Sequence, residues 1–240
     1  MPEIVRLLTA MDEPSTCPYL DGLTARMPLQ YPQQAVEPEQ LDDLLANGYR
    51  RSGWFYYRTA CPACNECRPL RVDVRCFAWT KSLKRVLKRG DAELRVECRE
   101  PSNDEQRVQL FNLHRNARDM SRNDTDTDAA GYEAFLCSSF NTTFELSYHA
   151  GNRLIAVAIT DAGARSLSAV YCFFDPEFDH LSLGTYSILK QIQIAERNEM
   201  EWLYLGMYVA GNRHLKYKAR YYPHERFCEG QWQRFEREGD

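Results

Sequence analysis

The sequence predicts an α/β fold in which a mixed sheet is flanked by helices, and three observations support this. The chain has 240 residues, 44% of them hydrophobic, which is enough for a substantial core. After about residue 100, segments with period-two or continuous hydrophobicity alternate with segments of helical periodicity. No stretch approaches the roughly 20 apolar residues of a membrane span, and the start lacks a signal peptide's pattern. We therefore expect a soluble, cytoplasmic protein without a membrane partner.

The first hundred residues show little regular periodicity apart from two helical stretches. In residues 38–47, leucines follow one another at helical spacing, Pro38 stands at the start and Gly48 follows the end. The second stretch, residues 80–89, is strongly basic. We predict that residues 1–100 form a cysteine-containing, basic N-terminal region that packs on the domain formed by residues 101–240.

The second region contains the expected strands of the sheet. A helix is predicted at residues 103–118. The elements predicted after it are strands at 144–148, 154–160 and 167–173, a helix at 184–199 and a strand at 202–205. This order resembles the core of the GNAT acetyltransferase fold. We therefore expect a GNAT-like mixed sheet flanked by helices in residues 101–240.

Positive charge is concentrated in one part of the chain. Residues 49–89 contain eleven Lys and Arg but two acidic residues, although the formal net charge of the whole chain is -4. In the predicted helix at 80–89, which Gly90 is expected to end, five cations share one face. They are Lys81, Lys84, Arg85, Lys88 and Arg89. Without acidic partners four residues away these cations repel one another, which favours binding of a nucleic-acid backbone over an ordinary solvated surface. Nearby aromatic residues favour RNA with a single-stranded end.

Three of the nine cysteines lie in a CxxCxxC segment. Cys61, Cys64 and Cys67 are close enough in sequence for one turning loop to present them to a single metal or cluster. Thiolates suit zinc or an iron–sulfur cluster, and a fourth ligand has to come from elsewhere in the chain. The alternative is a set of reduced thiols without a metal.

A series of short motifs resembles the arginyl-tRNA:protein transferase family, and within it the short bacterial leucyltransferases. The motifs are CPYL at 17–20, GYRR at 48–51, RTAC at 58–61, PLR at 69–71, TKSLKRVLKR at 80–89, FDP at 174–176, SLGTY at 182–186, GMY at 206–208 and KYKARYYP at 216–223. The resemblance implies transfer of leucine from leucyl-tRNA to the α-amine of proteins that begin with Asp or Glu, which marks them for degradation. It also nominates Cys17 as the fourth ligand beside the CxxCxxC cysteines.

The implied chemistry defines the expected site residues. An aminoacyl-tRNA ester is already activated, so the protein's task is placement, and no cofactor is required for transfer. For catalysis we nominate Asp175, Tyr208 and Lys216. For the acceptor carboxylate we nominate Arg50, Arg51, Arg71 and Lys218, because a cation is needed there. An apolar pocket for leucine is expected from Tyr171, Phe173 and Met207, although each of them also suits the core.

Other interpretations stay open. The donor can be arginine from arginyl-tRNA instead of leucine. The predicted strand order also suits an acetyl-CoA-dependent N-acetyltransferase, but residues 179–184 offer one glycine where such enzymes cradle a pyrophosphate. A non-catalytic RNA-binding module with a structural metal is the third possibility, and it leaves the acidic second half of the chain without a role.

Overall fold

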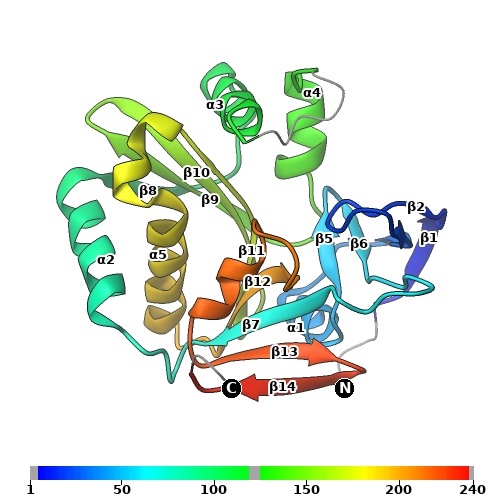
Figure 1. Cartoon of the computed structure of the whole chain (residues 1–240). Helices are drawn as coiled ribbons and strands as arrows, with labels where there is room; N and C mark the ends of the chain where they lie inside the picture. The colour runs from blue at the N-terminus through cyan, green and yellow to red at the C-terminus, as the bar shows by residue number, and fades with distance from the viewer. Residues whose placement is uncertain (1–4, 119–124, 238–240) are drawn as a thin grey trace.

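An eight-stranded mixed sheet forms the centre of the computed structural model, which describes residues 5–118 and 125–237 (Figure 1). In chain order its strands are β7 (Arg68–Asp73), β8 (Arg95–Arg99), β9 (Thr143–Ala150), β10 (Arg153–Ala162), β11 (Ser166–Phe174), β12 (Trp202–Tyr208), β13 (His224–Cys228) and β14 (Gln231–Phe235). Their spatial order is β14-β13-β7-β12-β11-β10-β9-β8. Neighbours are antiparallel except β11 and β12, which are parallel. The predicted α/β class is confirmed.

The connection from β11 to β12 contains helix α5 (Leu183–Arg197), as the GNAT-like order predicts. A short 3-10 turn, η3 (Pro176–Leu181), leads into this helix. The continuous apolar run of β10 has neighbours on both faces of the sheet. Ala156 and Ala158 pack with Tyr186 of α5, whereas Val157 and Ile159 belong to a cluster on the opposite face. A strand covered on both faces has no solvated side, so it lacks polar alternation.

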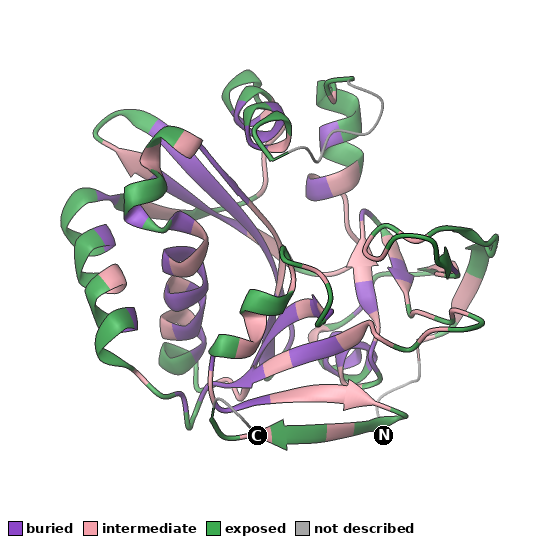
Figure 2. Cartoon of the chain, viewed as in Figure 1, coloured by how far each residue is buried: buried purple, intermediate pink, exposed green. Residues whose placement is uncertain are grey.

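Helices cover both faces of the sheet, and buried residues concentrate in the strands between them (Figure 2). On one face lie α5 and α2 (Lys81–Glu93). On the other lie α3 (Glu105–Asn116), α4 (Ala129–Tyr132) and the π-helical turn η2 (Glu133–Cys137). Within the described ranges, none of these helices has the length and apolar character to cross a bilayer.

The large sheet draws on both predicted regions of the chain, because β7 and β8 come from the first hundred residues. The rest of the N-terminal region contains the sheet strands β1 (Leu7–Met11), β4 (Leu29–Pro32), β5 (Arg50–Ser52) and β6 (Phe55–Tyr57), the pair β2 (Ser15–Thr16) and β3 (Thr24–Ala25), and helix α1 (Pro38–Ala46). Helix α1 confirms the helix expected at 38–47. The strands of this region have two to six residues, too few for a periodicity to stand out in the sequence.

Helix α2 continues beyond its predicted end. The prediction that Gly90 ends this helix is wrong, because the helix runs to Glu93. Gly90 instead marks the contact between α2 and α5. A Cβ placed on Gly90 would lie 2.3 Å from the ring of Tyr186, so only glycine allows this approach.

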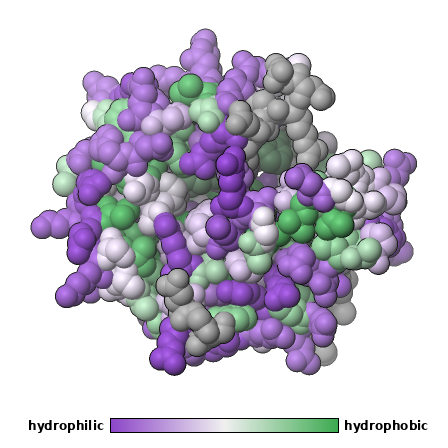
Figure 3. Space-filling model, viewed as in Figure 1, coloured by the Kyte–Doolittle hydropathy of each residue, from purple (hydrophilic) through white to green (hydrophobic). Residues whose placement is uncertain are grey.

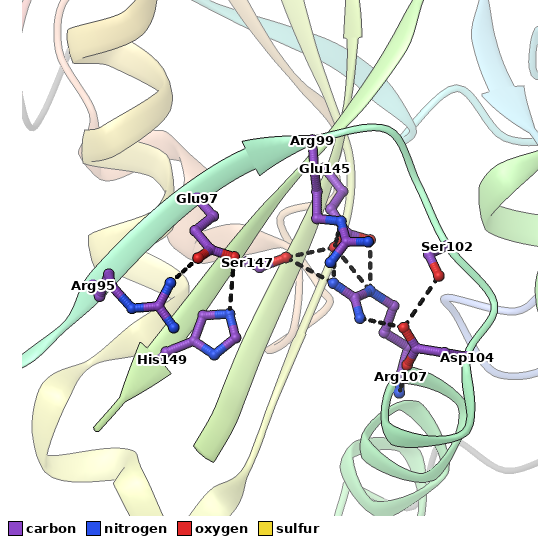
Figure 4. Close-up of polar contacts among 9 residues, drawn as sticks. All are labelled: Arg95, Glu97, Arg99, Ser102, Asp104, Arg107, Glu145, Ser147 and His149. Carbon is purple, nitrogen blue, oxygen red and sulfur yellow. Dashed lines mark hydrogen bonds and ion pairs between the residues drawn. The ribbon is translucent and has the colours of Figure 1, made fainter. Parts of the chain in front are cut away.

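A buried ion pair joins α3 to β9 (Figure 4). Nε of Arg107 donates to Oε1 of Glu145 at 2.8 Å, and Nη2 donates to the Ser147 hydroxyl at 3.0 Å. Arg107 also pairs with Asp104, whose carboxylate accepts the backbone N–H of Arg107 at the start of α3. Removing one partner of such a buried pair leaves an uncompensated charge and costs about 3–5 kcal/mol. The pair therefore fixes α3 on the sheet.

We expect Gly90→Ala to destabilise the fold. Alanine gains about 1 kcal/mol of helix propensity, but overpacking against Tyr186 costs about 1–3 kcal/mol. Because the added Cβ would lie only 2.3 Å from the Tyr186 ring, the cost of overpacking should exceed the gain in helix propensity. Urea denaturation should show a lower free energy of unfolding. In a Tyr186→Ala background the same substitution should become neutral or stabilising, and an equal loss in both backgrounds would contradict the steric explanation.

Candidate active site

Strands β11 and β12 separate and leave a cavity between them. They pair only from Ser166 to Ser168, opposite residues 202–204, and then diverge. A cavity of about 430 Å³ lies beyond this point. Its walls include residues 169–172 of β11, the first half of α5, Leu205 of β12, and the segment that leads into the turn η4 (Lys216–Arg220). A cavity of this size accommodates a small group such as an aminoacyl ester.

The wall formed by β12 is irregular. Pairing between β12 and β7 shifts register between Tyr204 and Met207, which adds one residue to β12. Gly206 lies in this bulge with φ 76°, a conformation that favours glycine. The bulge presents the Met207 carbonyl to the Lys218 side chain, whose Nζ donates to that oxygen at 2.9 Å.

Lys218 lies in the cavity wall without a carboxylate partner among the described residues. Burial, together with a smaller effect of the neighbouring Arg50 cation, lowers the pKa of Lys218 to about 7. At neutral pH this amine is therefore divided between its charged and neutral forms.

Arg50 is a second buried cation near Lys218. Its side chain lies over the Tyr204 ring, 5.1 Å from the centroid, and Nη1 donates to the Tyr49 carbonyl at 2.5 Å. Its Nε and Nη2 atoms are buried and have no hydrogen-bond partner in the described structure. Burial lowers the pKa of Arg50 to about 10. A buried guanidinium with free donors and no counter-ion is costly, and it is suited to receive a carboxylate.

The other arginines nominated for the acceptor already have carboxylate partners. Nε of Arg51 lies 2.8 Å from Asp161, and both side chains are buried. Arg71 lies 2.6 Å from Glu225. Its guanidinium also lies over two indole rings, those of Trp202 at 3.7 Å and Trp232 at 4.1 Å. The structure thus brings Arg50 and Lys218 together as the uncompensated pair.

The three residues nominated for catalysis do not line the cavity. Asp175 caps η3, where it accepts the Glu177 N–H at 3.0 Å, and pairs with Arg153. Tyr208 lies under the guanidinium of Arg226, 4.2 Å from the ring centroid. Lys216 is exposed at the start of η4. Their catalytic roles stay predictions.

Of the three residues expected to hold leucine, one faces the cavity. Tyr171 lines it, whereas Phe173 and Met207 are buried and absent from its lining. Several lining residues were not nominated from the sequence, namely His114, Arg118, Asp179, Thr185, His214 and Arg220. Two of them lie in motifs that the sequence offered, Thr185 in SLGTY and Arg220 in KYKARYYP.

The five predicted nucleic-acid-binding residues are all exposed on α2, and we call them the α2 cations. None of them forms an ion pair with a carboxylate in the part of the chain that the structure describes, and Arg89 donates to the His180 carbonyl. Leu83 of the same helix is buried. Hydrophilic residues project along the left edge of the molecule, where α2 lies (Figure 3). The surface therefore offers unneutralised positive charge.

The four predicted metal ligands lie near one another. Burial raises the pKa of the Cys67 thiol to about 12, and Cys61, Cys17 and Cys64 contribute in that order. The Cys61 sulfur also accepts the Arg26 N–H at 3.4 Å. Within residues 5–118 and 125–237, no three acidic, histidine or cysteine side chains are arranged for metal coordination. The four thiols therefore suit zinc or an iron–sulfur cluster in ligand type but not in their arrangement.

Two family models match this chain. The model described as "Arginine-tRNA-protein transferase, N terminus" matches residues 15–85, and "Arginine-tRNA-protein transferase, C terminus" matches residues 106–228. An aspartate/glutamate leucyltransferase of Alkalilimnicola ehrlichii is 37% identical over 217 residues, 90% of this chain and 90% of that protein. One of Aeromonas hydrophila is 34% identical over 233 residues, 97% of each. The crystal structure of FemX matches with a TM-score of 0.45 and 8% identity, over 73% of this chain and 62% of that chain.

His114 predicts an acid-sensitive contact at the cavity wall. Its Nδ1 accepts the Phe174 N–H at 3.1 Å, and burial lowers its pKa from 6.5 to about 4. As the pH falls from 6.5 towards 4, unfolded chains take up a proton here and folded chains do not. The free energy of unfolding should therefore decrease, with a contribution of up to about 1.4 kcal/mol per pH unit.

Urea denaturation across this pH range, compared with His114→Asn, isolates that contribution. The variant should lose part of the slope, whereas exposed His180→Gln should keep it. Identical slopes for wild type and His114→Asn would contradict the assignment.

Proposed function

This chain belongs to the arginine-tRNA-protein transferase family, and we propose that it transfers leucine from leucyl-tRNA to the α-amine of proteins that begin with Asp or Glu. The names of relatives that match nine tenths or more of the chain support leucine as the donor and an acidic first residue as the acceptor. Recognition of the acceptor is supported by two neighbouring cations without a carboxylate partner among the described residues, buried Arg50 and half-buried Lys218 in the cavity wall. Transfer takes place in the cytoplasm, where aminoacyl-tRNAs are made, and marks the acceptor for degradation.

The reaction exchanges an ester for an amide. The acceptor nitrogen attacks the ester carbon of the aminoacyl group, a tetrahedral intermediate forms, and the ribose oxygen leaves. The ester supplies the free energy, so the enzyme gains its rate from holding the two reactants in line and from stabilising developing charge. The cavity between β11 and β12 is where we place the ester, with Tyr171 against the leucine side chain.

Arg50 is the ligand we assign to the carboxylate of the acceptor's first residue. Its unpartnered Nε and Nη2 offer two parallel donors, the geometry that a carboxylate prefers. An acidic side chain compensates a buried charge, whereas a neutral side chain leaves that charge unpaired. Discrimination between Asp and Ala at the first position follows from this difference.

The α2 cations are the surface we assign to the tRNA backbone. From Lys81 to Arg89 the helix rises about 12 Å at 1.5 Å per residue, enough to follow a few phosphates of one strand. We assign Cys17, Cys61, Cys64 and Cys67 to a structural metal or cluster, which would tie the CxxCxxC loop to the segment around Cys17. The transfer steps themselves need no such group.

The direct test uses purified protein, separately charged leucyl- and arginyl-tRNA, and peptides that begin with Asp, Glu, Arg or Ala. Leucine should be transferred to the Asp and Glu peptides and to neither of the others. Arginyl-tRNA is the matched control for the donor. Transfer of arginine instead would identify the alternative donor, and labelling by acetyl-CoA without tRNA would replace the proposal with an acetyltransferase.

We expect reversal of the α2 charge to weaken tRNA binding. In Lys84→Glu/Lys88→Glu, the KM for leucyl-tRNA should rise at least tenfold, and the slope of log affinity against log salt should fall by about 0.7 to 0.9 for each lost phosphate contact. Fluorescence titration at several salt concentrations measures both. Arg6→Glu near β1, on the opposite side of the molecule, should change neither (Figure 1). An unchanged salt slope in the double variant would exclude α2 from the interface.

We expect Arg50→Gln to impair recognition of the acidic residue. Hydrogen bonds to a charged group contribute about 1.5–3 kcal/mol, so the KM for an Asp peptide should rise about 10- to 100-fold. The preference for Asp over Ala should shrink by a similar factor. Arg75→Gln, an exposed arginine paired with Glu201, is the control for loss of one positive charge. An unaltered Asp preference in a folded Arg50→Gln protein would remove this assignment.

A further inference from the structure

Lys218 lines the cavity and lies within electrostatic reach of Arg50, but it offers a different chemistry. We propose that its amine is the proton acceptor of the transfer, which takes one of the two protons lost by the acceptor's α-ammonium and delivers it to the departing ribose oxygen. This inference rests on the proposed function and assigns a catalytic group to it.

The position of Lys218 separates it from the other cations of η4. Lys216 and Arg220 are exposed, whereas the Lys218 side chain turns into the cavity wall. There its Nζ donates to the Met207 carbonyl at 2.9 Å, and Gly206 leaves room beside it, since even a Cβ at that position would lie 3.6 Å from Nζ. The β12 bulge thus holds the amine in one place at the edge of the cavity.

A neutral amine in this position has a free acceptor site. It carries two N–H donors and one lone pair. One donor is used by Met207, and no described residue forms an ion pair with the nitrogen. The lone pair can therefore point towards a proton of the incoming ammonium group. A guanidinium in the same place could not accept that proton, because it has no lone pair available.

The proton affinity of Lys218 matches the task. Burial and Arg50 bring the pKa of Lys218 to about 7, and an unperturbed α-amino group has a pKa of about 7.7–8.0. Groups that titrate near the working pH are the most effective proton carriers. Lys218 can thus accept a proton from the amine and, as an ammonium, protonate the leaving oxygen.

Charged and titratable groups face this end of the cavity from several elements. In the lining they are His114 and Arg118 from the α3 side, Asp179 of η3, His214 before η4, and Arg220 of η4. Arg50 of β5 lies outside the lining, and its charge acts on Lys218. Asp179 is the one carboxylate among the described lining residues, and it lies beyond ion-pair distance of Lys218. The surroundings of Lys218 are therefore predominantly cationic before the acceptor binds.

An acidic acceptor changes this balance. Its carboxylate at Arg50 adds negative charge beside Lys218, which raises the proton affinity of the amine in the complex. An Asp or Glu acceptor therefore strengthens the base that it needs, and an Ala acceptor does not. Specificity then affects the rate of the chemical step as well as binding.

The step is balanced without a further reactant. The bond between the acceptor nitrogen and the ester carbon forms, and the bond between that carbon and the ribose oxygen breaks. The acceptor's ammonium loses two protons as it becomes an amide. One moves to Nζ of Lys218 and then to the ribose oxygen, and the second is released to solvent when the tetrahedral intermediate becomes the amide. No oxidation occurs, and Lys218 returns to its neutral form.

The test compares wild type, Lys218→Arg and Lys218→Met in single-turnover transfer from leucyl-tRNA to a saturating Asp peptide between pH 5.5 and 9. The wild-type rate should rise with pH and level off above an inflection that lies higher than 7, because the bound acidic acceptor raises the proton affinity of Lys218. Lys218→Arg keeps the positive charge but should lose at least 100-fold in rate, with the peptide KM changed less than threefold. In Lys218→Ala, small primary amines added to the buffer should restore part of the rate.

Lys190→Met, a lysine paired with Asp91 outside the cavity lining, is the matched control, and melting temperatures verify that each variant folds. If Lys218→Arg transfers at near the wild-type rate, or if the loss appears only in the peptide KM, Lys218 is a carboxylate ligand and the inference is overturned. Failure of the wild type to transfer leucine at all would instead overturn the proposed function. The inference is supported if added amines restore transfer by Lys218→Ala and if, without amines, this variant lacks the pH inflection of the wild-type rate.

Discussion

The early separation of β11 and β12 is the constraint on which the rest of the site depends. Parallel strands in a sheet normally remain paired, but these two pair over three residues and then diverge. The β12 bulge at Gly206 completes the separation, because it shifts the strand against β7 on its other side. The space that opens is covered by η4 and the start of α5. Tyr171 and Lys218, which we assign to leucine binding and proton transfer, both line this opening.

Charge pairing distinguishes the structural cations from the functional ones. Arg51, Arg71 and Arg107 are buried or half-buried, and each has a carboxylate partner within 2.8 Å or less. Arg50 and Lys218 have none among the described residues. Burial of an uncompensated charge destabilises a fold. The fold retains buried Arg50 within electrostatic reach of half-buried Lys218 in the cavity wall, which is the expected signature of a site that a negatively charged substrate completes.

Features that depend on local residue spacing, such as single helices and strands, could be predicted from the sequence. Features that depend on contacts between distant segments, such as strand pairing, could not. The five α2 cations were predicted from their helical spacing and β10 from its continuous apolar run, because each pattern lies within a single element. The insertion of β7 between β12 and β13 was not, since pairing across more than a hundred residues leaves no local pattern. Arg50 and Arg51 show the limit at the site. They are adjacent, so a strand directs them to opposite sides, and sequence alone does not say which side meets Asp161.

The link between α2 and the cavity explains how backbone contacts can control chemistry. Helix α2 packs against α5 at Gly90, and its Asp91 accepts the Tyr186 hydroxyl at 2.8 Å. Thr185 and Ile188 of α5, one and two residues from Tyr186, line the cavity. Because the same helix forms both contacts, the α2 cations cannot shift relative to the cavity without breaking buried packing. An enzyme that acts by placement requires such a rigid connection, since an error of about 1 Å at the ester costs about 100-fold in rate.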